Sequence, residues 1–180
     1  KTNEFTINYD YSENILFKST AYKTKIFDRI ESNAAYSKHE NMKTDIKQEG
    51  LENTVSFKNN NHAFSLFSNF SKSRKDNGQA QNRRPDLSYG ANYTAKIKSS
   101  PIGEFMMNVN YKYTGNYTDW DGAKNSKQKS VDIVNLTLNK KIFKNSISFD
   151  IKNLFDKHYE KPATYGQDGR RMSINFRKTY

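Results

Sequence analysis

The 180-residue chain contains no cysteine and no long apolar run. Without cysteine there can be no disulfide framework, no thiolate metal site and no cysteine nucleophile. The mean hydropathy is −1.02, and no stretch approaches the roughly 18 consecutive apolar residues of a membrane-spanning helix. These absences exclude a disulfide-rich scaffold and a helical membrane protein.

Aromatic residues are abundant for so polar a chain, at 14% of the total. Disordered chains of similar polarity usually lack aromatic residues, so we expect a folded protein. The chain opens at Lys1 without an initiator methionine, a basic segment or an apolar segment. Any signal peptide is therefore expected to have been removed or to lie upstream.

Apolar and polar residues alternate with a period of two along nearly the whole chain, which predicts strands. No segment has a helical period, so the predicted class is all-β with about nine antiparallel strands. Each is expected to be long enough for the roughly 9–11 residues of a tilted membrane-spanning strand. The alternating segments are 5–11, 14–27, 51–57, 64–70, 87–97, 105–113, 134–138, 147–151 and 172–176, of which 14–27 is the least regular.

The expected connections alternate in length. Short turns are predicted near residues 12–14, 59–61, 99–103 and 144–145, and long loops near 28–44, 74–86, 118–130 and 156–169. Short turns at one end and long loops at the other are typical of an outer-membrane barrel. Soluble barrels also alternate apolar and polar faces, so a soluble barrel remains an alternative.

The two faces of the predicted strands differ in composition. The polar face carries Asn, Lys, Thr and Asp with few small residues that could fill a core, which favours a polar lumen over a packed interior. Tyrosine is common in any strand, but several tyrosines here lie toward strand ends, where a membrane-interface girdle would be. These are Tyr9, Tyr11, Tyr111, Tyr113 and Tyr117.

The last third of the chain contains a specific motif. It consists of Asn153, Leu154, Phe155 and Asp156, then Tyr159, then Gly169 and Arg170, and a final strand that closes on Tyr180. This pattern resembles the C-terminal end of TonB-dependent outer-membrane receptors. Two shorter segments, Gly50-Leu51-Glu52 and Arg84-Pro85, are similar to strand starts of the same family. Lys178 departs from the apolar alternation of such C-termini.

The resemblance implies an antiparallel up-and-down transmembrane β-barrel in the outer membrane of a Gram-negative bacterium. The family has a 22-strand barrel and a plug, and 22 strands would need on the order of 440 residues. Residues 1–180 are therefore expected to form the C-terminal portion of such a barrel, about nine strands, without the plug domain and TonB box. In the family's topology the long loops are extracellular.

The resemblance also implies a function and partners. The receptor would import a scarce iron chelate (siderophore), cobalamin or haem, energised by the TonB complex through the plug. Outer-membrane lipid, lipopolysaccharide and the barrel assembly machinery are the other implied partners. Two alternatives remain: a small self-contained outer-membrane barrel with a structural or adhesive role, and a soluble ligand-binding β-barrel.

Ligand-binding residues of such a receptor would lie in the long loops. Arginine beside aromatic rings would suit a catecholate iron chelate, although each of these residues could be an ordinary loop residue. Arg84 and Arg170 are better explained as holding strand starts. The candidates are Arg83, Arg84, Tyr117, Trp120, His158, Tyr159, Tyr165 and Arg170.

Catalysis, metal binding and nucleic-acid binding have no support in the sequence. His39, His62 and His158 lack metal-ligand spacing, and no nucleophile, phosphate or dinucleotide motif is present. We therefore expect no enzyme activity, no cofactor and no resident metal. The net charge of +11 is assigned to contact with an anionic outer leaflet and to anionic ligands that approach the mouth of the barrel. Nucleic acid is disfavoured because lysines and aromatic residues lie on opposite strand faces rather than in one nucleic-acid-binding patch.

Overall fold

The computed structural model describes residues 1–32, 38–41, 44–99, 101 and 103–178. Within these residues there are thirteen strands and no helix long and apolar enough to cross a membrane. The strands are β1 (Thr2–Ser12), β2 (Ile15–Ile26), β3 (Ile30–Ser32), β4 (His39–Asn41), β5 (Ile46–Lys58), β6 (His62–Lys75), β7 (Leu87–Ser99), β8 (Gly103–Thr114), β9 (Tyr117–Trp120), β10 (Asn125–Gln128), β11 (Val131–Ile142), β12 (Asn145–Lys152) and β13 (Arg171–Arg177). The all-β prediction is confirmed.

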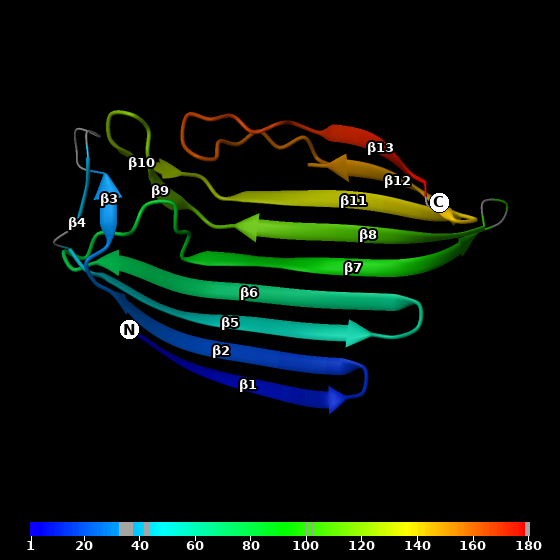
Figure 1. Cartoon of the computed structure of the whole chain (residues 1–180), viewed down its shortest axis with the longest axis horizontal. Helices are drawn as coiled ribbons and strands as arrows, with labels where there is room; N and C mark the ends of the chain where they lie inside the picture. Colours follow the sequence, from blue (N-terminus) through cyan, green and yellow to red (C-terminus); the bar gives the residue numbers. More distant parts are fainter. Residues whose placement is uncertain (33–37, 42–43, 100, 102, 179–180) are drawn as a thin grey trace.

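Nine of the strands form one antiparallel sheet in the order β1-β2-β5-β6-β7-β8-β11-β12-β13. Each of these strands lies beside the next one along the chain, which is the up-and-down arrangement predicted from the sequence (Figure 1). The pairs β3–β4 and β9–β10 form separate hairpins inside two of the long connections. In the described part of the chain, β1 and β13 are the two edges and do not pair with each other, so the sheet is open.

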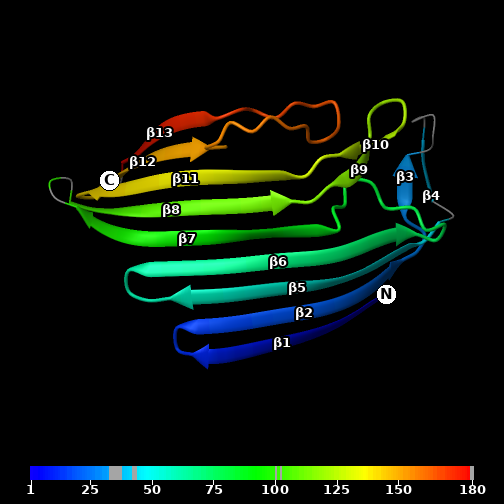
Figure 2. The same ribbon diagram turned by 180° about the vertical axis from the view of Figure 1, so that it is seen from behind.

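Short turns and long loops alternate along the chain, as predicted. Two-residue turns follow β1 and β11, a three-residue turn follows β5, and β7 ends at Ser99 just before β8 begins at Gly103. The four long connections all lie at the opposite end of the sheet, as Figures 1 and 2 show from the two sides. We call these the turn end and the loop end.

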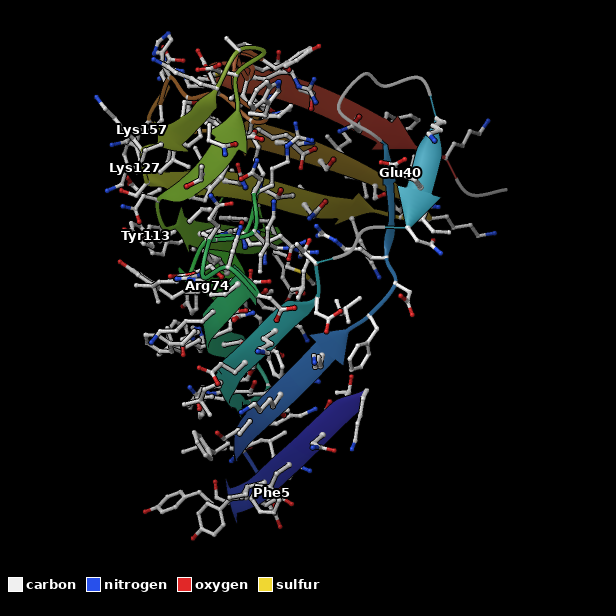
Figure 3. The ribbon with its side chains drawn as sticks, turned by 90° about the vertical axis from the view of Figure 1, so that its left-hand side faces the viewer. Phe5, Glu40, Arg74, Tyr113, Lys127 and Lys157 are labelled. Atoms are coloured by element: carbon white, nitrogen blue, oxygen red, sulfur yellow. The ribbon has the colours of Figure 1, made fainter. Side chains whose placement is uncertain are left out.

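The register places most apolar residues of the nine strands on one face, the apolar face. One cross-strand row on it runs through Phe5, Ala21, Leu51, Phe70 and Leu87. Seen from the loop end, the sheet bends into an arc, and Tyr113, which belongs to this face, lies on its outer side (Figure 3). The apolar face is therefore the convex one.

The apolar face is exposed rather than packed. Phe5 is 66% exposed and Ile174 is 74% exposed. Among the described residues the buried apolar side chains are few: Ile46, Ala95, Ile151 and Ala163. A contiguous exposed apolar surface of this extent requires apolar surroundings.

Tyrosines mark both ends of the apolar face. At the loop end Tyr89 stacks on Tyr113 with 4.6 Å between ring centroids, and Tyr111 lies beside it. At the turn end Tyr9 and Tyr11 are exposed near the end of β1. Four of the five tyrosines predicted to form a girdle thus lie on the apolar face near strand ends.

Tyr117 differs from that prediction. β8 ends at Thr114, and the amide of Gly115 donates a hydrogen bond to the carbonyl of Leu87. A Cβ on Gly115 would lie 2.7 Å from that oxygen. The chain therefore leaves the main sheet before Tyr117, which belongs to the β9–β10 hairpin.

Three further expectations differ from the structure or lie outside it. β12 and β13 have 8 and 7 residues, fewer than the 9–11 expected. β12 ends where Asn153 takes a positive φ of 51°. Gly50 lies inside β5 rather than at its start. Tyr180 lies outside the described residues.

Gly50 makes room for an aromatic ring on the polar face. The ring of Tyr22 lies across Gly50 and its hydroxyl donates a hydrogen bond to Ser71 on the next strand, at 3.1 Å. Gln48 donates from its side-chain amide to both hydroxyls, at 3.3 Å each. A Cβ on Gly50 would lie 2.6 Å from the Tyr22 ring and 2.7 Å from the carbonyl oxygen of Phe70. An aromatic side chain that covers a strand glycine pins the register of the strands it spans.

We expect Gly50→Ala to lower the free energy of unfolding by about 1–3 kcal/mol, because the added methyl group must displace both the ring and a backbone oxygen. Urea unfolding of the full-length protein in lipid bilayers measures this. Gly166→Ala is the control, since nothing lies within 4 Å of the Cβ it would add. Equal losses in the two variants would contradict the role of Gly50.

Candidate functional site

A hollow of about 650 Å³ lies at the loop end, where β8 and β11 meet the β9–β10 hairpin and the β12–β13 loop. Its floor consists of polar-face residues of two neighbouring strands, which the register holds side by side. Because the walls come from connections far apart in the sequence, the hollow exists only when these loops are folded together. The strand residues of the floor are Asn110, Lys112, Thr114, Val131, Ile133 and Asn135.

The hollow has an excess of positive charge. Two carboxylates line it, and one of them, Asp132, lies 3.6 Å from the ammonium group of Lys157. At the loop end, Lys127 and Lys157 project to the side of the sheet on which Tyr113 also lies (Figure 3). An excess of three positive charges in a concave site attracts anionic ligands. The charged residues of the lining are Lys112, Lys127, Lys129, Lys157 and Lys161 against Asp132 and Glu160.

Two tyrosines add neutral hydrogen-bonding groups. Burial and the nearby negative charge of Asp119 raise the pKa of Tyr117 above its ordinary value, so its hydroxyl keeps its proton. Tyr159 lines this hollow and also a second one of about 340 Å³ beside it, under the β12–β13 loop. The two hollows therefore adjoin at Tyr159.

Asp119 joins three loops through one buried carboxylate. Its Oδ1 accepts hydrogen bonds from Arg83 Nε at 2.7 Å and from the Trp120 amide at 2.8 Å. Its Oδ2 accepts from the Ala163 amide at 2.9 Å, and the Arg83 amide donates to the Thr118 carbonyl. Burial alone would raise the pKa of Asp119, but the hydrogen bonds from Ala163 and Arg83 outweigh it and lower the pKa. The carboxylate is therefore ionised, and it connects the β6–β7, β8–β11 and β12–β13 loops.

Asn153 folds the chain back after β12. It is 5% exposed and has a left-handed backbone, which asparagine adopts more readily than most residues. Its side chain accepts a hydrogen bond from the Lys157 amide at 2.9 Å and donates to the carbonyls of Lys157 and Asp168. Its own amide donates to Asn135 Oδ1 at 3.0 Å. One residue thus ties both ends of the β12–β13 loop to the floor of the hollow.

The rest of the C-terminal motif closes the same loop. Asp156 Oδ1 accepts a hydrogen bond from the Arg170 amide at 2.6 Å. A Cβ on Gly169 would lie 2.5 Å from that oxygen, so a larger residue at this position would have to displace the Asp156 carboxylate. Leu154 donates its amide to the Val134 carbonyl, and Phe155 is exposed. The described part of the motif has a structural role, which explains the spacing between its two halves.

The structure brings three of the eight predicted ligand residues together. Tyr117, His158 and Tyr159 line the hollow. Arg83 is engaged by Asp119, and the Arg170 amide is engaged by Asp156. The other three, Arg84, Trp120 and Tyr165, are exposed and lie outside the lining.

The lysines of the hollow were not among the predicted residues. The predicted ligand residues were arginines, aromatic residues and one histidine, whereas the positive charge was assigned only as a whole to the membrane leaflet and to anionic ligands. A usable signal was present, because Lys127 with Lys129 and Lys157 with Lys161 occur as close pairs in two of the predicted long loops. Among the described residues, no group of three or more His, Asp or Glu side chains could hold a metal ion.

No protein-family model matches the sequence, and no curated protein is significantly similar to it. Solved structures do match. The ferric yersiniabactin uptake receptor FyuA from Yersinia pestis gives a TM-score of 0.77 at 16% identity, over 97% of this chain and 27% of that one. The ferripyoverdine receptor of the outer membrane of Pseudomonas aeruginosa gives 0.75 at 16% identity, over 98% and 27%. The FrpB iron transporter from Neisseria meningitidis gives 0.74 at 15% identity, over 96% and 30%.

These neighbours are TonB-dependent outer-membrane receptors. The chain has the fold of a segment of their barrels. The resemblance drawn from the C-terminal motif is thus confirmed for the fold, over almost the whole chain. The chain spans less than a third of the length of each structure named here.

We expect Asp119→Ala to free the three loops from one another. The amides of Ala163 and Trp120 would lose their acceptor in a buried site, at a cost on the order of 1–3 kcal/mol in local stability. Amide hydrogen exchange at Ala163 in the full-length protein measures this as faster exchange. Asp121→Ala is the control in the same hairpin, because in the described part of the chain the Asp121 carboxylate accepts hydrogen bonds from two amides of its own turn, those of Ala123 and Lys124. Unchanged exchange at Ala163 would contradict the role of Asp119.

The same contact should be lost in acid. Because the folded-state pKa of Asp119 is lowered, its stabilisation is fully present above the unfolded-state value of about 3.9 and is lost as the pH falls through the folded-state pKa. Exchange at Ala163, corrected for the intrinsic pH dependence of the amide, should stay constant from pH 7 to about pH 4 and accelerate below it. An acceleration that begins near pH 6 would show that another group controls these loops.

Proposed function

We propose that this chain is the C-terminal part of the barrel of a TonB-dependent outer-membrane receptor that imports an anionic iron chelate. The observation that carries the proposal is the lysine-lined hollow at the loop end of a sheet whose convex face is apolar. An exposed apolar outer face fits lipid, and a polar inner face fits a lumen. A cationic hollow at the loop end fits a binding step before passage.

The outer-membrane location is supported by the faces of the sheet. Seven of the nine main strands have 11 to 14 residues, enough for a tilted strand to cross the hydrocarbon region, which needs about 9–11. Tyrosines at both ends of the apolar face fit the two membrane interfaces. The neighbours in structure are outer-membrane receptors, which agrees with this placement.

The ligand class follows from the charge of the hollow. Iron chelates built on catecholate or carboxylate groups carry negative charge, and five lysines surround the hollow against two carboxylates. Tyr117 and Tyr159 supply hydroxyl groups that can donate to the ligand's oxygen atoms. A corrinoid offers little negative charge for these lysines, so we place cobalamin behind the iron chelates. Haem carries negatively charged propionates, so we place it between the anionic iron chelates and cobalamin.

Binding at the loops would be followed by passage through the lumen, energised by the TonB complex through a plug. The plug and TonB box lie outside residues 1–180, so transport belongs to a longer protein. The neighbours by name are transporters and receptors rather than enzymes, which supports a role in binding without chemistry.

The intact mass of the protein extracted from native outer membranes tests this proposal first. A mass several times 21.0 kDa is expected for a receptor of which this chain is one part. A mass near 21.0 kDa in that fraction would favour the small self-contained barrel instead. Absence from the membrane fraction would contradict both readings and leave the soluble barrel.

We expect Lys112→Gln combined with Lys157→Gln to weaken binding of anionic chelates. Each lost charge should cost roughly 1 kcal/mol, or about thirtyfold for the pair of changes. Titration of the full-length protein with ferric complexes of a tricatecholate, citrate and a neutral trihydroxamate, and with cobalamin, measures the change. The loss should be larger for the first two ligands than for the others.

The control for this variant is Lys96→Gln combined with Lys141→Gln. Both residues lie in the same sheet, away from the hollow. This control should bind every ligand as the parent protein does. Equal weakening in the two variants, or no preference of the parent for anionic chelates, would contradict the assignment of the hollow.

A further inference from the structure

The turn end of the sheet is asymmetric in charge. The β7–β8 and β11–β12 connections and the end of β13 share one half of this end, because their strands are neighbours in the sheet (Figures 1 and 2). Residues 98–104, 140–145 and 177–178 carry six basic side chains and one carboxylate, whereas the other two turns, 10–15 and 57–63, have a net charge of −1. We call the six basic residues the basic rim: Lys98, Lys140, Lys141, Lys144, Arg177 and Lys178.

Contacts between neighbouring strands hold the basic rim together. The ammonium group of Lys140 donates to the backbone carbonyl of Glu104 at 3.5 Å, which links β11 to the start of β8. Ser146 stands between Lys141 and Arg177 in the register, which places these two side chains in one cross-strand row. The cluster is therefore set by the sheet itself rather than by one connection.

Most of the charge of the basic rim is unmatched. Among the described residues, no ion pair is found for four of its six members. At the loop end, by contrast, Lys25 and Asp45 lie 3.0 Å apart, and Lys47 and Asp76 lie 3.3 Å apart. Like charges held close together repel, so an acidic partner that covers the cluster would relieve this repulsion. The four members are Lys98, Lys141, Lys144 and Arg177.

Three of these four residues lie on the face of the sheet that lipid does not reach. Lys98, Lys141 and Arg177 alternate with the apolar positions of β7, β11 and β13, so their side chains lie on the polar face. The opposite, apolar face is the one assigned to lipid. A partner for these three charges therefore comes from the aqueous side.

Phe143 adds an apolar group at the tip of the same region. It is the first residue of the two-residue turn between β11 and β12, with a φ of 55° and a side chain that is 99% exposed. Such turns favour glycine, asparagine or aspartate, and a bulky residue with positive φ is strained. Strained residues of this kind concentrate at functional sites. An apolar pocket on a partner would also remove the ring from water.

We propose that the basic rim and Phe143 bind an acidic segment of a second protein on the turn side of the membrane. Carboxylates of that segment would face the basic rim, and the ring of Phe143 would enter an apolar pocket beside them. Because Phe143 lies at the tip of a turn, a partner that reaches it approaches from beyond the end of the sheet. The inference rests on the membrane location given under the proposed function, and it concerns the end of the barrel opposite the lysine-lined hollow.

Photo-crosslinking in native outer membranes tests the surface. In the full-length protein p-benzoylphenylalanine replaces Phe143, and the crosslinked peptides are sequenced by mass spectrometry. We expect a crosslink to an acidic segment of another protein. A synthetic peptide of the crosslinked sequence is then the probe for titration of the purified full-length protein. Its Kd should rise about tenfold when Lys98→Gln, Lys144→Gln and Arg177→Gln are combined, because three exposed charge contacts are lost.

Phe143→Asn separates a binding role from a structural one. Asparagine adopts a positive φ more readily than phenylalanine, so the thermal midpoint of unfolding should stay the same or rise. Binding of the probe peptide should nevertheless weaken about tenfold, because an aromatic anchor is lost. A lower thermal midpoint with unchanged peptide binding would show a structural role for Phe143 and contradict the proposal.

Matched controls remove the same groups from the loop end. Lys23→Gln, Lys72→Gln and Lys75→Gln together remove three charges from β2 and β6. Phe155→Asn removes another exposed phenylalanine. Neither control should change peptide binding by more than about twofold, because salt screens charges at the other end of the sheet.

Several outcomes would overturn the proposal. Crosslinks to lipid alone, or only within the receptor's own chain, would remove the second protein as the occupant. Equal weakening in the test and control variants would show unspecific attraction by the net charge. The turn-end variants should bind ferric complexes as the parent protein does. A receptor that imports iron but gives no crosslink to an acidic segment would therefore leave the proposed function intact and contradict this inference alone.

Discussion

The structure depends on a period of two that stays in register across nine strands. A shift of one residue between any two neighbours would move every side chain of the following strands to the other face. Two contacts fix the register in the first half of the sheet. One is the ring of Tyr22 over Gly50, with its hydroxyl on Ser71, and the other is the pairing of Thr6 with Thr20 on the polar face. The separation into an apolar and a polar face, on which the floor of the lysine-lined hollow depends, follows from this register.

The loops depend on polar groups because they have little apolar surface to bury. Asp119 holds three of them with one carboxylate, and Asn153 holds the two ends of the last loop. Buried groups of this kind stabilise a single geometry, since each lost hydrogen bond leaves an unsatisfied donor. They keep the lysines of the hollow together despite their mutual repulsion. The lysines that would bind a ligand are therefore held in place by the carboxylate of Asp119, which is buried and out of a ligand's reach.

The strands and their connections could be predicted because alternation is a local signal. Nine strands, four short turns and four long loops follow from the parity of residues such as Phe105, Met107 and Val109. The β9–β10 hairpin could not be predicted in this way, because it lies within a predicted loop and its strands have only four residues each. The end of β12 depends on the backbone of Asn153, whose conformation is determined by contacts with Lys157 and Asp168.

The candidate site was harder to predict because it depends on contacts between residues that are far apart in the sequence. Arginine and aromatic residues were chosen by their chemistry, yet a long-range contact decides which of them is available. Arg83 is taken up by Asp119, 36 positions along the chain, while Tyr117, two residues before Asp119, lines the hollow. No sequence pattern within one loop distinguishes Arg83, which Asp119 binds, from Tyr117, which lines the hollow. The motif residues Asp156, Gly169 and Arg170 were recognised by their spacing, but their role in closing a loop required the structure.

The polar face connects the hollow to the rest of the sheet through asparagines. Asn110 donates to Asn92 at 2.6 Å, Asn135 donates to Asn110 at 3.2 Å, and the Asn153 amide donates to Asn135. The side-chain amides of the first three have both a donor and an acceptor, so each can continue the row across a further strand. The row begins on β7, forms the floor of the hollow and ends at the residue that folds the last loop. A ligand that contacts this floor would therefore touch the same hydrogen-bonded row that sets the position of its own binding loop.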